Sequence, residues 1–112
     1  MSSREKEAAE RQRRKSVLLT GIIAFADGTR SFDCTVHDLS ASGARIAAGK
    51  TMQLPSRFYL INIRDRVAYD CEAVWNRGSE AGIAFKKVLP LANITDPALG
   101  FLKRLWLSKA TR

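Results

Sequence analysis

The strongest constraint on the fold is a series of short strand-like segments, each closed by a turn. In residues 67–75, apolar and aromatic side chains recur at every second position, so they share one face of a strand. Turn residues such as Asp27-Gly28 separate one segment from the next. About six strands at roughly 8–12-residue spacing predict an all-β domain, a small antiparallel barrel or a sandwich. The predicted strands are residues 17–25, 31–36, 44–47, 58–63, 67–75 and 81–85.

One helix is predicted after the last strand, over residues 95–110. Asp96 can cap its N-terminus, and Pro97 suits the first helical position because its missing N–H would have no partner there. Apolar residues then recur at helical spacing, so one face can pack on the barrel and close one of its ends. A helix that binds a partner instead is the alternative. The residues of this face are Leu99, Leu102, Leu105 and Trp106.

The first 16 residues form a basic arm with almost nothing to bury, and they are predicted to be flexible. The 112-residue chain has 19 lysines and arginines against 11 acidic residues, a net charge of +8. Such a surface attracts an anion, either a nucleic acid, a nucleotide, an acidic protein or a membrane face, although the charge can also serve solubility alone. The chain therefore divides into a basic arm (1–16), a barrel (17–88) and a helix (95–110).

Other side chains argue against several classes of protein. Cys34 and Cys71 lack zinc-site spacing, and the strand-like context of both favours buried thiols over a disulfide. The lone histidine, His37, has no nucleophile beside it, so a non-enzymatic protein without a metal or a cofactor is expected. No apolar stretch reaches membrane-spanning length and no signal-peptide pattern is present, so a cytoplasmic location is expected.

The most unusual polar stretch lies between the second and third predicted strands. Asp38 and Ser40 are two residues apart, which places them on one side of extended backbone, and Gly43 follows where the chain turns. A carboxylate held in this way can accept the two parallel N–H donors of guanine, and a hydroxyl can donate to a base or phosphate oxygen. The alternative is purely structural, because aspartate, serine and glycine commonly build such turns.

The basic arm offers the complementary chemistry. A guanidinium is a planar fork that matches phosphate oxygens and the O6/N7 edge of guanine. The arm and the Asp38 loop (residues 38–43) could together contact both edges of guanine and its phosphate. Arg45 and Arg77 are further phosphate contacts or plain exposed residues. Trp75 is expected in the core, and the alternative is an aromatic ring near a strand end that stacks on a base. The candidate cations of the arm are Arg11, Arg13, Arg14 and Lys15.

At these residues the sequence resembles the PilZ domains, bacterial receptors for cyclic di-GMP. Asp38, Ser40 and Gly43 match the family motif [DN]-x-S-x-x-G in full, and the runs CTVHDLSASGARI and CEAVWNRGSEAGIAF are similar to PilZ sequences. The resemblance covers about residues 10–88. It implies a six-stranded antiparallel barrel that binds cyclic di-GMP, with the ligand-binding residues Arg11, Arg13, Arg14, Lys15, Asp38, Ser40 and Gly43.

One motif departs from the family pattern. PilZ domains carry R-x-x-x-R before the first strand, whereas the arm offers R-x-x-x-K from Arg11 to Lys15. Lysine keeps the charge but loses the bidentate fork, which should weaken guanine recognition more than phosphate attraction.

The expected function is a cyclic di-GMP receptor whose arm becomes ordered on ligand binding and signals to a downstream protein partner. Two alternatives stay open: a PilZ-like adaptor that no longer binds the dinucleotide, and a basic small barrel that binds nucleic acid. Against the second, no run of aromatic and basic residues alternates across one predicted sheet face. The sequence predicts no particular oligomeric state.

Overall fold

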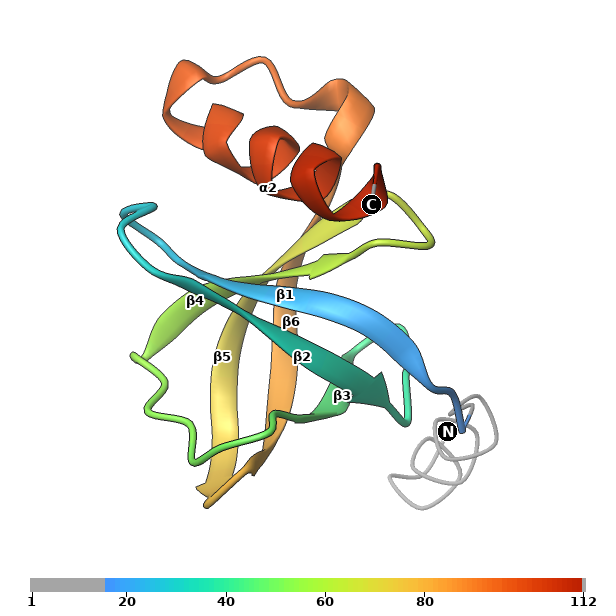
Figure 1. The fold of residues 1–112 in the computed structure, drawn as a ribbon, viewed down its shortest axis with the longest axis vertical. Helices are drawn as coiled ribbons and strands as arrows, with labels where there is room; N and C mark the ends of the chain where they lie inside the picture. The colour runs from blue at the N-terminus through green and yellow to red at the C-terminus, as the bar shows by residue number, and fades with distance from the viewer. Residues whose placement is uncertain (1–15, 112) are drawn as a thin grey trace, which may run out of the picture.

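A computed structural model describes residues 16–111, and six antiparallel strands form its centre. They close into a barrel in the order β1-β2-β3-β6-β5-β4 (Figure 1). The sequence-based prediction of a six-stranded antiparallel barrel followed by one α-helix is thus confirmed. The strands are β1 (Leu19–Phe25), β2 (Ser31–His37), β3 (Gly43–Ala47), β4 (Arg57–Asn62), β5 (Val67–Arg77) and β6 (Glu80–Pro90).

Strand β1 explains why the first apolar run is continuous rather than alternating. Ile23 points into the barrel and is fully buried, whereas its neighbours Ile22 and Ala24 belong to a second buried cluster on the other face. Because successive side chains of a strand point to opposite faces, a strand covered on both sides must be apolar at every position. The barrel interior is filled by Ile23, Cys34, Val36, Ile46, Met52, Phe58, Leu60, Cys71, Ala81 and Ile83.

The C-terminal segment covers the outer face of β1, β4 and β5. It comprises the 3₁₀ turns η1 (Leu91–Asn93) and η2 (Pro97–Leu99) and the helix α2 (Gly100–Ala110). Leu102 is fully buried in the cluster with Ile22 and Ile61, so α2 packs beside the barrel wall instead of plugging an end. No helix within residues 16–111 combines the length and the apolarity needed to span a membrane.

The predicted cap forms, but it does not start the α-helix. The Asp96 carboxylate accepts the Ala98 N–H at 2.9 Å, and Pro97 takes the first position of the turn. That turn is η2, a 3₁₀ turn, and α-helical geometry begins only at Gly100. Tight 3₁₀ turns are common at helix N-termini, which a spacing argument cannot distinguish from a first α-helical turn.

Strand β5 carries a bulge that overturns the core placement of Trp75. Ala73 pairs with Ile83 and Trp75 pairs with Gly82, so Val74 is an extra residue without a partner. The bulge breaks the alternation, and Val74 and Trp75 are 69% and 39% exposed. The expectation that Trp75 packs in the core with Cys71 was therefore wrong.

The two cysteine thiols are expected to stay unreactive until the protein unfolds. Cys34 and Cys71 are free and buried, and burial raises the pKa of each thiol from 9.0 to about 12. The thiolate is the nucleophile, so native protein at pH 8 should resist iodoacetamide and denatured protein should take up two labels, as read by intact mass. Rapid labelling of folded protein would contradict the prediction.

Burial of the two thiols also makes the free energy of unfolding depend on pH. The stabilisation that comes from keeping both thiols protonated is complete below pH 9 and is lost as the pH rises from about 9 to 12.

Candidate functional site

The Asp38 loop begins with a strained residue. Asp38 follows the last residue of β2 and has a φ of 44°, in the left-handed region. Among residues other than glycine, aspartate and asparagine enter this region most readily. The turn directs the Asp38 side chain across to β3, where its carboxylate meets a side chain rather than the amides of its own turn.

Ser40 holds the loop together. Its hydroxyl oxygen accepts the N–H groups of Ser42 and Gly43 at 3.3 and 3.2 Å, and the Ser40 N–H donates to the Gly43 carbonyl at 2.9 Å. The hydroxyl also lies 3.2 Å from the Gly43 carbonyl oxygen, to which it can donate. Ser40 therefore stabilises a turn, which is the structural alternative to a ligand-binding role. It fixes the loop from which Asp38 projects.

Gly43 is required by the approach of two strands. It begins β3 and pairs with Ala84 of β6, and a Cβ atom at this position would overlap the backbone carbonyl oxygen of Ile83. Its φ lies outside the left-handed range, so the role of this glycine is close backbone packing rather than a special turn conformation. This contact fixes the end of the loop to the barrel wall.

Arg45 links the loop to the neighbouring hairpin. Its Nε–H donates to the Asp38 carboxylate at 2.9 Å, and its Nη1–H donates to Glu80 at 2.7 Å. The hydrogen bond to Asp38 is the main cause that raises the pKa of the Arg45 guanidinium above its ordinary value. Each side chain of the trio is partly exposed, at 35% for Arg45, 39% for Asp38 and 47% for Glu80, so all three can meet a ligand.

A pocket of about 160 Å³ opens beside this trio. Asp38 and Arg45 form its polar side, and the bulged residues Val74 and Trp75 form its apolar side. The Trp75 indole lies directly on Gly82, where any Cβ atom would overlap the ring. Glycine at position 82 thus lets the indole lie on the strand with part of its surface open to the pocket. A carboxylate, a guanidinium and an aromatic ring together can bind a planar base with N–H donors.

The sequence predicted only part of this arrangement. Asp38, Ser40 and Gly43 share one loop, as their spacing suggested, whereas Arg11, Arg13, Arg14 and Lys15 lie outside the described residues. Trp75 was expected in the core, with base stacking only as the alternative, and the β5 bulge brings it to the loop. Glu80 was missed, because only the register of β3 with β6 brings it there. Within residues 16–111, no group of three metal-ligating side chains comes together.

The path of the chain into β1 passes close to the Asp38 loop. Leu19, the first residue of β1, pairs with Val36 of β2, two residues before Asp38. Figure 1 shows the start of β1 on the same side of the barrel as the end of β2. The chain therefore enters β1 beside the loop.

Comparison with known proteins agrees with the resemblance found in the motifs. The family model for the PilZ domain matches residues 6–96, which is most of the chain and includes the Asp38 loop, the β5 bulge and all six strands. No curated protein matches the chain. The closed barrel, the complete [DN]-x-S-x-x-G loop and the family match lead to one conclusion: the chain belongs to the PilZ domain family.

Proposed function

We propose that this PilZ domain is a cytoplasmic receptor for cyclic di-GMP that carries out no chemistry of its own. PilZ domains are generally receptors for this dinucleotide, and they act as binding and adaptor domains. The observation that carries the proposal is the position of the Asp38 carboxylate, which lies at a pocket beside Arg45 and Trp75 and outside its own turn.

Asp38 is the acceptor for guanine in this proposal. A carboxylate has about four lone-pair sites, so its bond to Arg45 leaves capacity for the ring N–H and the exocyclic amine of one guanine. Trp75 supplies an aromatic surface next to that base, and stacking on an aromatic ring is worth about 1–3 kcal/mol per base. Arg45 keeps the carboxylate oriented and places a positive charge near the phosphates.

The basic arm contributes the second set of contacts. Arg11, Arg13, Arg14 and Lys15 would bind the phosphates and the O6/N7 edge of guanine, and the pairing of Leu19 with Val36, close to Asp38, supports a contribution of the arm to this site. Ligand binding would then order the arm, and the ordered arm would signal to a partner protein. Fixing a residue costs about 1–2 kcal/mol of backbone entropy, so we expect micromolar rather than nanomolar affinity.

Calorimetric titration with cyclic di-GMP tests the proposal. We expect saturable binding in the micromolar range, with GTP and the linear dinucleotide binding far more weakly. An absence of heat and of saturation at high micromolar ligand would refute the receptor function. Preference for long oligonucleotides without regard to guanine content, with a steep loss of affinity as salt rises, would favour the nucleic-acid alternative instead.

The second candidate function is an adaptor that no longer binds the dinucleotide. The R-x-x-x-K sequence of the arm favours this candidate, because it lacks the second arginine of the family motif. Substitution Lys15→Arg restores the family spacing with Arg11, and a bidentate fork should replace a point charge. For a receptor we expect roughly tenfold tighter binding, since one added hydrogen bond to a charged group is worth about 1.5–3 kcal/mol. The matched control Lys50→Arg adds an arginine on the barrel and should leave affinity unchanged. Failure of both the native chain and K15R to bind would favour the adaptor.

A further inference from the structure

A second hollow, distant in chain position from the Asp38 loop, lies between α2 and the barrel. This groove, called the α2 groove below, has a volume of about 370 Å³. Val67 of β5 and Leu91 of η1 line it, together with Trp106 and Leu107 of α2. Leu107 is 51% exposed, which leaves a large apolar side chain facing solvent at the rim.

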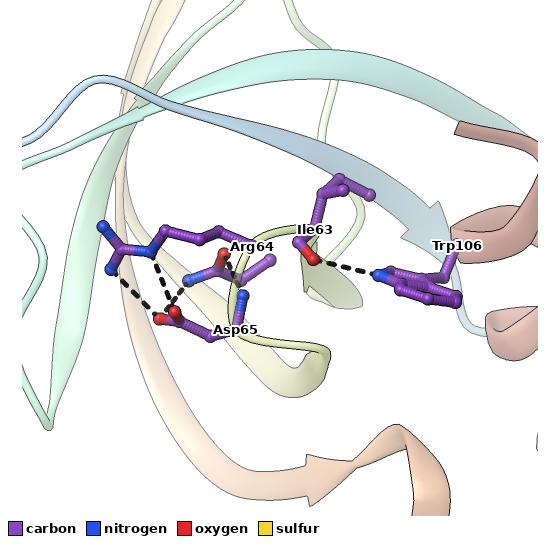
Figure 2. A network of polar contacts seen from close by, with 5 residues as sticks. Ile63, Arg64, Asp65 and Trp106 are labelled. Carbon is purple, nitrogen blue, oxygen red and sulfur yellow. Dashed lines mark hydrogen bonds and ion pairs between the residues drawn. The ribbon is translucent and has the colours of Figure 1, made fainter. Parts of the chain in front are cut away.

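The walls of the α2 groove are fixed before anything binds. The Trp106 indole N–H donates to the Ile63 carbonyl at 2.9 Å, which anchors α2 to the turn between β4 and β5 (Figure 2). That turn is held in place by Asp65, whose N–H donates to the Asn62 side chain at 3.2 Å and whose carboxylate accepts bonds from Asn62 and Arg64. A preformed groove spares a partner the cost of ordering it.

The rim of the α2 groove is cationic. The Arg66 guanidinium lies 5.5 Å from the centre of the Trp106 ring, and Lys103 lies one turn before Trp106 on α2. Within residues 16–111, neither Arg66 nor Lys103 forms an ion pair, whereas the Asp65 carboxylate at the rim is paired with Arg64 at 2.8 Å. Arg66 stacked on an indole keeps its N–H edge available for a carboxylate.

The positive charge of the rim argues against the basic arm and against a second copy of the chain as occupants of the groove. The basic arm has six basic side chains against three acidic ones, and a second copy of the chain carries a net charge of +8. Both would bring positive charge towards Arg66 and Lys103. An occupant that suits the groove has apolar side chains for Val67, Leu91 and Leu107 and carboxylates for the rim.

We propose that the α2 groove docks an acidic amphipathic helix of a partner protein. Its apolar face would cover Trp106 and Leu107, in the manner of a helix bound in a groove, and its carboxylates would pair with Arg66 and Lys103. The α2 groove would be the surface through which the domain contacts the partner protein of the proposed function. The docking rests on the groove alone and needs no dinucleotide, so the two can fail separately.

The test uses a synthetic helical peptide of about 15 residues with leucines on one face and glutamates elsewhere, titrated into ¹⁵N-labelled protein without cyclic di-GMP. We expect saturable shifts at the Trp106 indole N–H and at the amides of Leu107 and Arg66. The substitution Leu107→Glu should weaken binding at least tenfold, because it places a charge where the docked helix would bury an apolar side chain, and burying one such side chain is worth about tenfold in affinity. Val88→Glu is the matched control, since Val88 is 50% exposed, lies outside the groove and should leave binding intact.

A charge exchange makes the test independent of any folding defect. Lys103→Glu should weaken the glutamate peptide and strengthen a peptide in which lysines replace the glutamates. Equal binding of both peptides to the native protein, equal loss in V88E and L107E, or the absence of localised shifts would overturn the proposal. The groove would instead bind a second copy of the chain if the glutamate peptide failed to bind and L107E abolished self-association. It would bind a lipid surface if the peptide failed to bind and L107E abolished binding to anionic phospholipid vesicles. Either result would overturn the proposal.

Discussion

Replacing Asp38 with alanine is expected to weaken cyclic di-GMP binding by about a hundredfold. The substitution removes the acceptor for two guanine N–H donors, and each hydrogen bond to a charged group is worth about 1.5–3 kcal/mol. It also removes the 2.9 Å bond to the Arg45 Nε–H, so the guanidinium that borders the pocket is then held by Glu80 alone. Calorimetric titration of the variant against the native protein measures the loss.

Asp38→Asn is the matched control for that experiment. Asparagine tolerates the φ of 44° that alanine adopts only with strain, and the family motif accepts asparagine at this position. D38N keeps an acceptor oxygen, so its affinity should fall by no more than about tenfold. Thermal unfolding of both variants checks that the protein is folded during the titration. An unchanged affinity in D38A would show that guanine is not bound at this carboxylate.

Gly43→Ala is expected to destabilise the fold by about 3 kcal/mol, near the upper end of overpacking effects. The added methyl group meets the Ile83 carbonyl oxygen, which belongs to the backbone of β6 and cannot rotate away as a side chain could. Strands β3 and β6 would have to separate where they close one side of the barrel. Urea unfolding followed by circular dichroism measures the change in the free energy of unfolding.

Gly49→Ala provides the comparison within the same part of the chain. No atom lies within 4 Å of the Cβ position at Gly49, and its φ is outside the left-handed range, so G49A should be neutral or slightly stabilising. Equal stability of G43A and G49A would mean that the close approach of β3 and β6 is not what requires glycine in the motif.

The barrel was predictable because its information is local. Turn residues and two-residue alternation mark most strands directly, and the capping residues Asp96 and Pro97 mark the start of the C-terminal turn. The bulge at Val74 was not predictable, because an extra residue is defined only by what the partner strand offers opposite it. One such residue moved Trp75 from the expected core to the rim of the pocket.

The candidate site likewise combines residues that are close in the sequence with residues that only strand pairing brings together. Asp38, Ser40 and Gly43 are close in the sequence, so their grouping follows from spacing and from the family motif. The contact of Arg45 with Glu80 joins residues 35 positions apart, and only the pairing of β3 with β6 brings them together. Spacing does not determine that Asp38 has a φ of 44° and bonds to Arg45 while the Ser40 hydroxyl bonds within the loop.

Hydrogen–deuterium exchange with and without saturating cyclic di-GMP tests most directly whether the ligand is held between the basic arm and the Asp38 loop. Slower exchange on ligand addition is predicted in two segments together, residues 11–15 and residues 38–45, with little change in α2. Protection confined to one of these segments, or protection that appears only at the α2 groove, would contradict the two-sided binding of guanine on which the proposed function depends.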